Sequence, residues 1–246
     1  MGSVIAVLSG KGGTGKTSVC AGISAALAAA GEQVLCVDCD VGLRNLDISL
    51  GLNDSGALSF QDISEGGYSL RQAESHPDFP SLFFLTAPMN RTVEQIDAEA
   101  FCRMLSQARA TFDYVFLDAP AGVEAGFHLA SMAADRCIVV TGSGPAAVRD
   151  ASRVGDLLEL AGKNDVRLIV NRVDKTMLSI LHQTIDDVMD AAGLPLLGIV
   201  LEDPDIPMAA ANGMSLALYN KRSTAAKSFQ RIAKRIQGYP EPIKIR

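Results

Sequence analysis

The stretch that decides the fold is residues 4–17, which read Val4-Ile5-Ala6-Val7-Leu8-Ser9-Gly10-Lys11-Gly12-Gly13-Thr14-Gly15-Lys16-Thr17. Its first five residues are all apolar and predict a buried β-strand. The last eight satisfy the pattern G-x-x-x-x-G-K-[ST], and an apolar helical pattern follows from Thr17 to Ala30. A glycine-rich loop between a strand and a helix is the setting in which backbone N–H groups surround phosphate oxygens. The stretch therefore predicts a site for a nucleoside triphosphate.

The residue types of this loop match that chemistry. Glycines let the backbone curl around phosphate oxygens, and the helix N-terminus adds a partial positive charge. We expect Lys16 to reach the β- and γ-phosphates and the Thr17 hydroxyl to ligate Mg²⁺. The residues expected to bind the phosphates are Gly10, Gly12, Gly13, Thr14, Gly15, Lys16, Thr17 and Ser18.

Short apolar runs alternate with helical patterns along the rest of the chain. The expected strands are 4–8, 33–38, 82–85, 114–118, 136–141, 167–171 and 196–200, and the expected helices are 17–30, 93–110, 146–160, 178–191 and 224–237. This alternation predicts an α/β fold with one mostly parallel sheet and helices on both faces. We expect a single P-loop domain over residues 1–237 and a short proline-containing tail over 238–246. The irregular stretch 53–80 is expected to loop over one edge of the sheet.

Acidic residues follow two of the expected strands. The second strand runs into Asp38-Cys39-Asp40, and Val115-Phe116-Leu117 runs into Asp118 and then Ala119-Pro120-Ala121-Gly122. Carboxylates at the carboxyl ends of parallel strands lie in the crevice where such folds bind ligands. We therefore expect Asp118 to hold Mg²⁺ through water, and the Gly122 N–H to sense the γ-phosphate.

Together these motifs resemble the MinD/ParA family of deviant Walker A P-loop ATPases. The run KGGTGKT contains the second lysine, Lys11, that marks the deviant loop. The patterns D-x-D-x-G-L-R-N-L-D over 38–47 and D-x-P-A-G-x-E over 118–124 are similar to the two switch segments of the family's septum-site-determining branch. Matches at 62–66, 82–88 and 212–213 extend the resemblance over nearly the whole chain.

The resemblance implies a Mg²⁺-dependent ATPase that forms a homodimer around ATP. It implies that Lys11 crosses the dimer interface to the partner's nucleotide, and that Asp40 positions or deprotonates the attacking water. Asn45 and Gly122 would move with the nucleotide state. The implied catalytic residues are Lys11, Lys16 and Asp40, and the implied Mg²⁺ residues are Thr17, Asp38 and Asp118.

The base-binding residues rest on the same resemblance. It implies that the base contacts Asn171, at the end of a later strand, together with Pro204 and Asp205 in the turn after the next strand. Helix-cap and turn roles explain these three residues equally well, so both alternatives stay open.

Charge is distributed unevenly along the chain. The whole chain has 22 Lys and Arg against 28 Asp and Glu, a net charge of −6, which excludes a strongly basic nucleic-acid coat protein. Residues 221–246, however, carry a net +7, which leaves −13 for the remainder. The pattern over 224–237 predicts either a core-packed final helix with a solvated basic face or a helix that lies on anionic lipid.

Several features of the sequence bear on the cellular compartment of the protein. Five cysteines scattered in apolar runs, no signal-peptide pattern and no long apolar stretch predict a cytoplasmic protein. Members of the family usually carry a further membrane-targeting helix, whereas residues 238–246 contain two prolines. We therefore predict weak or no vesicle binding, and attachment to the inner face of the cell membrane stays open.

The leading interpretation is an ATP-hydrolysing switch that dimerises around ATP and places the division site. A division inhibitor and an activating protein are partners implied by the resemblance alone. A DNA-partitioning ATPase of the ParA type, or an ATPase that places flagellar or surface assemblies, would share every nucleotide motif. The acidic net charge argues against DNA, and the basic C-terminal segment keeps that alternative open.

Overall fold

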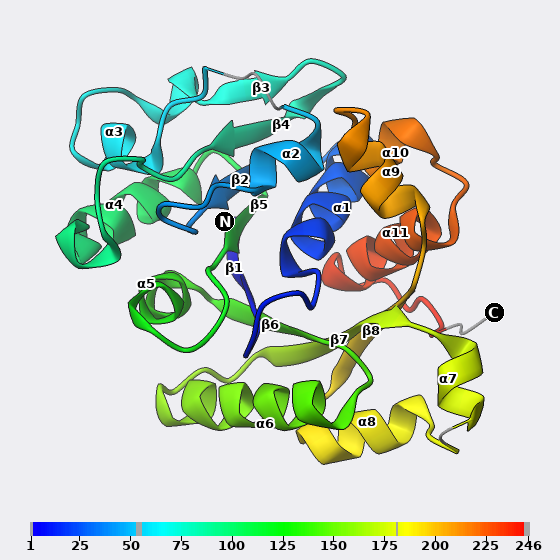
Figure 1. Ribbon diagram of the computed structural model, residues 1–246. Coiled ribbons are helices and arrows are strands. Elements are labelled where there is room, and N and C mark those ends of the chain that lie inside the picture. The colour runs from blue at the N-terminus through cyan, green and yellow to red at the C-terminus, as the bar shows by residue number, and fades with distance from the viewer. Residues whose placement is uncertain (1, 53–55, 181, 244–246) are drawn as a thin grey trace.

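The computed structural model describes residues 2–52, 56–180 and 182–243. Within them, eight strands form one sheet in the order β3-β4-β2-β5-β1-β6-β7-β8 (Figure 1). Every neighbouring pair is parallel except β3 with β4, which confirms the predicted mostly parallel sheet. The strands are β1 Ser3–Leu8, β2 Val34–Asp38, β3 Glu74–His76, β4 Phe79–Leu85, β5 Tyr114–Asp118, β6 Arg136–Thr141, β7 Val166–Val173 and β8 Leu196–Leu201.

Helices cover both faces of the sheet, as predicted (Figure 1). Side chains of β1 alternate between two hydrophobic clusters, because successive residues of a strand point to opposite faces. One cluster packs under α1 Lys16–Ala29, α2 Leu46–Leu50, α9 Asp205–Ala211, α10 Leu216–Tyr219 and α11 Thr224–Ile236. The other packs under α3 Phe60–Ser64, α4 Ala98–Ala108, α5 Ala125–Ala133, α6 Pro145–Leu160, α7 Lys175–Ile180 and α8 Ile185–Ala192.

Two expected helices are shorter than their apolar patterns. The pattern over 93–110 gives a 3₁₀ turn at Val93–Gln95, and α4 begins only after Asp97, whose side chain accepts a bond from Ala100 N. The expected helix over 178–191 is wrong, because α7 and α8 are separate helices and a capping box starts α8 at Thr184. In both cases the apolar periodicity predicts one continuous helix, whereas a polar N-cap residue begins a new helix partway along it.

Other elements are absent from the sequence prediction. The stretch 53–80 does lie at one edge of the sheet, but it contributes the antiparallel strand β3 and the helix α3; residues 53–55 lie outside the described part. Helix α5 was not expected. Its segment reads Ala-Gly-Phe-His-Leu-Ala-Ser-Met-Ala, which is weakly patterned, and the helix forms because Phe127 and Ala130 are buried in the core.

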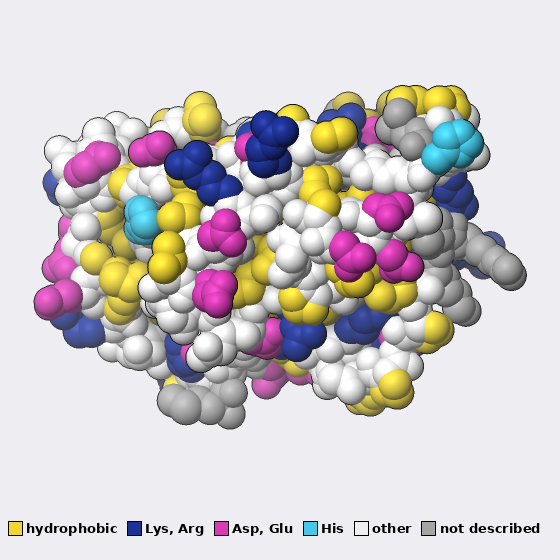
Figure 2. Space-filling model, turned by 90° about the horizontal axis from the view of Figure 1, so that it is seen from below, with side chains coloured by type: hydrophobic (Ala, Val, Ile, Leu, Met, Phe, Trp, Pro, Cys, Tyr) yellow, Lys and Arg dark blue, Asp and Glu magenta, His cyan; other side chains and the backbone are white. Residues whose placement is uncertain are grey.

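The basic C-terminal helix is packed into the core. Ala225, Phe229 and Ile232 of α11 are each at most 2% exposed, and Arg235 donates to the carbonyl oxygen of Leu197 in β8. The core-packed alternative is therefore correct. No helix in the described ranges is long and apolar enough to cross a membrane. Figure 2 shows another face, formed by α5, α6 and α8, over which acidic, basic and apolar side chains are interspersed.

Candidate nucleotide-binding site

The glycine-rich loop connects β1, in the middle of the sheet, to α1. Gly13 and Gly15 have φ angles of +79° and +81°, a backbone conformation that side chains other than glycine rarely adopt. Gly15 is also the N-cap of α1, and a Cβ atom there would collide with the side-chain amide of Asn171. The loop therefore requires glycine at the point where the helix N-terminus opens toward the crevice.

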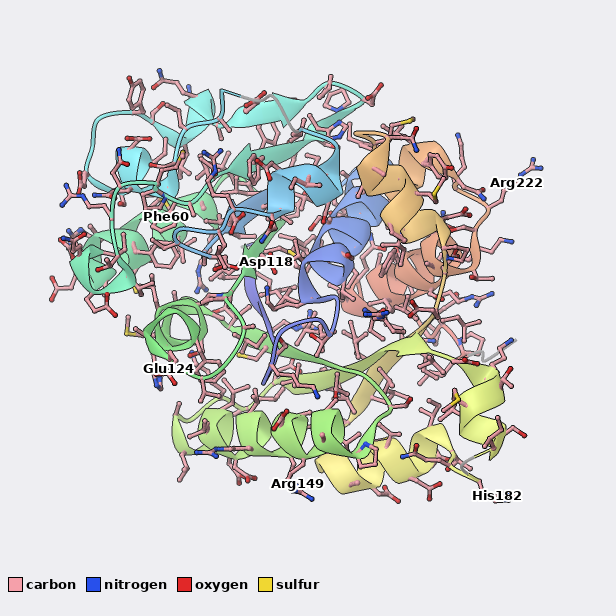
Figure 3. All side chains as sticks on the ribbon, viewed as in Figure 1. Phe60, Asp118, Glu124, Arg149, His182 and Arg222 are labelled. Carbon is pink, nitrogen blue, oxygen red and sulfur yellow. The ribbon has the colours of Figure 1, made fainter. Side chains whose placement is uncertain are left out.

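Lys16 and Asp118 form a buried ion pair at the mouth of this loop. Lys16 Nζ lies 2.7 Å from Asp118 Oδ1, and the two residues are 6% and 1% exposed. Figure 3 shows Asp118 at the centre of the molecule, between α1 and the segment that leads to α2. Burial lowers the pKa of Lys16, but the Asp118 carboxylate more than offsets this, so the pKa lies above its ordinary value. The lysine is therefore held in its charged form.

Asp38, at the end of β2, supports the following segment. It lies in register with Asp118 on the neighbouring strand. Its Oδ1 accepts from Asp40 N at 2.9 Å, and its Oδ2 accepts from Asn45 N and Leu46 N at 3.1 Å each. Burial and then the charge of Asp118 raise the pKa of Asp38 to about 6, against the lowering effect of the three N–H groups. Both oxygens are thus already engaged in shaping residues 40–46.

Asp40 lies within electrostatic reach of the same cluster. Burial raises its pKa, Lys16 lowers it and Asp118 raises it, and the net pKa is above the ordinary value. The predicted acidic and basic residues Lys16, Asp40 and Asp118 are therefore brought together. Thr17 follows directly, with its Oγ1 3.5 Å from Lys16 Nζ.

Gly122 is hydrogen-bonded to the start of the phosphate loop, whereas Lys11 lies on its exposed side. The Gly122 N–H donates to Ser9 O at 3.0 Å, and its response to the γ-phosphate stays a prediction. Ser9 Oγ in turn donates to Lys11 O at 3.1 Å. Lys11 is exposed at the surface, as a residue acting on another molecule must be.

A cavity of about 300 Å³ continues from the loop between α1, α9 and the end of β8. Gly15, Ser18 and Asn171 line its end at the loop. Asn171 is 2% exposed and its Nδ2 donates to Thr14 O at 2.8 Å, while its Oδ1 has no partner among the described residues. A residue that lines the cavity thus carries a buried acceptor without a partner in the described part of the chain.

The turn after β8 reaches the cavity with other residues than predicted. Glu202, Asp203, Ile206 and Pro207 line it, whereas Pro204 and Asp205 do not. Asp205 instead accepts from Asn220 Nδ2 at 2.8 Å, and Pro204 is the N-cap of α9. These are turn and cap roles, and contact of these two residues with the base stays a prediction.

Sequence reasoning missed two further residues. Asp203 accepts from Thr224 Oγ1 at 2.6 Å and Ala225 N at 2.9 Å, which joins the end of β8 to the start of α11. Arg172 has φ +55° and donates to Gly13 O at 3.2 Å while pairing with Glu202. The acidic cluster after β8 was a usable signal for Asp203, but nothing local indicates Arg172.

The site's unpaired groups fit a nucleotide with Mg²⁺. Thr14 Oγ1 and Asn171 Oδ1 are both buried and lack a hydrogen-bond partner within the described part of the chain. Side-chain oxygens of Thr17 and Asp118 are hard donors suited to Mg²⁺. Both oxygens of Asp38, the third predicted Mg²⁺ residue, accept backbone N–H bonds instead. In the described residues no three His, Cys, Asp or Glu side chains form a preformed metal cage, and Mg²⁺ is commonly held by one or two carboxylates plus substrate phosphates.

A glycine loop at the carboxyl end of a central parallel strand, opening a helix toward a buried lysine and carboxylates, is the arrangement that binds nucleotide phosphates in P-loop proteins. Fold and site together therefore define a nucleotide-binding protein of the P-loop class.

Comparisons with known proteins narrow this class. The model of the CobQ/CobB/MinD/ParA nucleotide binding domain matches residues 5–216. The septum site-determining protein MinD of Synechocystis sp. is 38% identical over 244 residues, which cover 98% of this chain and 92% of that protein. MinD of Bacillus subtilis is 36% identical over 250 residues, which cover 100% of this chain and 92% of that protein. The chain belongs to the MinD branch of the MinD/ParA family.

Solved structures agree with this assignment. The MinC:MinD cell division protein complex of Aquifex aeolicus contains a chain with a TM-score of 0.90 and 32% identity, with 98% of each chain covered. MinD of Pyrococcus horikoshii, solved with Mg-ADP, has a TM-score of 0.84 and 28% identity, with 96% of each chain covered.

Proposed function

We propose that this chain is a Mg²⁺-dependent ATPase that acts as a nucleotide-controlled switch in placing the division site. The observation that carries the proposal is the buried Lys16–Asp118 pair beside a phosphate loop that also presents an exposed second lysine, Lys11. The MinD relatives support the cellular role.

Each polar side chain near the phosphate loop has a separate role in the proposed hydrolysis. Lys16 exchanges its bond to Asp118 for phosphate oxygens, because both partners then keep a countercharge. Thr17 and Asp118 would hold Mg²⁺, which supplies screening of the phosphate charge. Asp40 orients the attacking water and accepts its proton, and Asp38 keeps the Asp40 segment in place through three backbone bonds.

The cavity selects the base through Asn171. Because Nδ2 is committed to Thr14 O, Oδ1 is the atom of this amide that remains available to a ligand. An acceptor suits the amino group on the six-membered ring of adenine and disfavours the carbonyl oxygen that guanine carries at the same place. This supports ATP as the substrate.

Lys11 extends the proposal to an ATP-bound homodimer. Its backbone carbonyl is tied to Ser9, while its side chain is exposed and free to reach a second copy. A structure of a relative contains MinD together with MinC. We propose that this chain likewise binds a MinC-like division inhibitor, and that a separate protein activates its ATPase.

The test is ATP turnover combined with the oligomeric state. Purified protein should hydrolyse ATP only with Mg²⁺, and light scattering should give a dimer with ATP and a monomer with ADP. The same assays with anionic vesicles and with arbitrary duplex DNA identify the surface that stimulates turnover. Absence of hydrolysis in every condition contradicts the proposal, and salt-sensitive, ATP-dependent DNA binding would favour a partitioning ATPase instead.

A further inference from the structure

Helix α2 follows the segment that carries Asp40, and it is held at both ends. At its start, Asp38 Oδ2 accepts from Asn45 N and Leu46 N. At its end, the ring of His76 lies with Nε2 2.9 Å from the carbonyl oxygen of Leu50. His76 belongs to the edge strand β3, so this contact joins the edge of the sheet to the helix after the Asp40 segment.

The neighbours of His76 fix its tautomer. Its Nδ1 lies 3.1 Å from Asp78 N, and a backbone N–H can only donate. Nδ1 is therefore the acceptor, and the ring proton sits on Nε2, from which it is donated to Leu50 O. The ring is 2% exposed and packs against Phe79 with a centroid distance of 5.0 Å. Both ring nitrogens are thus engaged, and the ring is confined.

The far end of α2 is also packed against a wall of the nucleotide cavity. Gly51, the C-cap of α2, has φ +79°, and a Cβ there would lie 2.7 Å from Ser215 N. Met214 and Ser215 line the cavity. A shift of the C-terminal end of α2 is therefore restricted on one side by the cavity wall and on the other by His76.

We propose that His76 is a positioning residue for ATP hydrolysis. By holding Leu50 O it fixes α2, and with Asp38 at the other end it fixes the orientation of the segment that presents Asp40. The inference rests on the proposed ATPase function and adds to it a residue remote from the phosphates. His76 lines neither the nucleotide cavity nor the phosphate loop, so its loss should lower turnover more than it weakens nucleotide binding.

Two amide variants test the two hydrogen bonds of the His76 ring separately. In His76→Gln the side-chain amide nitrogen replaces Nε2 and still reaches Leu50 O. In His76→Asn the shorter amide can satisfy Asp78 N but not Leu50 O. We expect kcat to fall about fivefold in His76→Asn, with a smaller change in KM, and kcat to return to near the wild-type value in His76→Gln. A matched control is Ser81→Ala, which removes a hydrogen bond from β4 to Ala28 O without touching α2; its kcat should not change.

Amide hydrogen exchange gives a readout that does not depend on turnover. His76→Asn should exchange about fivefold faster at the amides of residues 46–50 than the wild type, while His76→Gln and Ser81→Ala should not. If the wild type fails to hydrolyse ATP, the proposed function fails, and the exchange result alone decides whether His76 holds α2. If the wild type hydrolyses ATP and both amide variants have equal kcat, or if His76→Asn matches the wild type, the positioning role is overturned.

Discussion

The ammonium group of Lys16 lies 2.7 Å from the Asp118 carboxylate, and both residues are almost completely withdrawn from water. Each is the other's countercharge while the loop holds no phosphate. A buried charge that loses its partner is costly, so neither residue can leave the pair unless another charged group replaces it. The pair therefore links nucleotide binding directly to the strand end that would hold Mg²⁺.

Removal of one member of this pair should destabilise the fold. In Lys16→Met the Asp118 carboxylate stays buried without a countercharge, and the free energy of unfolding should fall by about 3 kcal/mol. The double variant Lys16→Met/Asp118→Leu should recover most of this loss because it leaves no buried charge. Urea denaturation measures both. Equal destabilisation of the single and double variants would show that the pair is not the cause.

Lys11 should matter for association and not for folding. Lys11→Ala changes an exposed side chain, so unfolding should shift by less than about 0.5 kcal/mol and ADP should still bind. The ATP-dependent dimer should be lost in light scattering. Lys227→Ala, an exposed lysine on α11, is the matched control and should dimerise normally. A Lys11→Ala protein that still dimerises with ATP would remove the proposed role across the interface.

Asp38 predicts a specific dependence of stability on pH. Its pKa is about 6 in the folded protein against an ordinary value near 4 in the unfolded chain. Between these values the folded state binds more protons, so this group's contribution to the free energy of unfolding falls as pH rises through that window, by on the order of 3 kcal/mol.

The Asp38→Asn variant isolates that contribution. Asparagine does not titrate, but it weakens the bonds to Asn45 N and Leu46 N, so the variant should be less stable by an amount that does not vary with pH. Because the wild type loses stability as pH rises from about 4 toward 7, its stability advantage over the variant should narrow across that range. Denaturation curves at several pH values give the comparison. A difference that does not vary with pH would contradict the raised pKa.

Asn171 should control base selectivity. Asn171→Leu keeps the branching and the number of heavy atoms of the side chain but removes both the bond to Thr14 O and the unpaired acceptor Oδ1. The preference for ADP over GDP, measured by calorimetric titration, should fall about tenfold, the equivalent of ~1.4 kcal/mol. Asn212→Leu, an exposed amide outside the cavity lining, is the control. An unchanged preference would place base recognition elsewhere.

The sequence predicts best those features that local chemistry determines. The loop around Lys16 and the strands before Asp38 and Asp118 each follow from a short run of residue types, because backbone geometry and burial at those places depend on neighbours in the chain. The same runs are enough to predict the sheet, since parallel strands that end in functional residues converge at one edge.

The remaining features depend on contacts between distant segments. Helix α5 forms because Phe127 is covered by the core, which no local pattern reports. Pro204 and Asp205 lie in the predicted turn, but the Asp205 carboxylate accepts a bond from Asn220, fifteen residues further along the chain, which no local pattern indicates. The αL backbone of Arg172 and its bond to Gly13 O likewise require the folded loop before they can be seen.

The bond from Gly122 N to Ser9 O has a consequence for the energetics of switching. The amide already has an acceptor, so its movement toward a third phosphate would trade one hydrogen bond for another instead of creating one. Such an exchange gains only the difference between a charge-assisted and a neutral hydrogen bond, about 1 kcal/mol. The two loop positions would then lie close in energy, and a modest difference in affinity between ATP and ADP would be sufficient to reverse their populations.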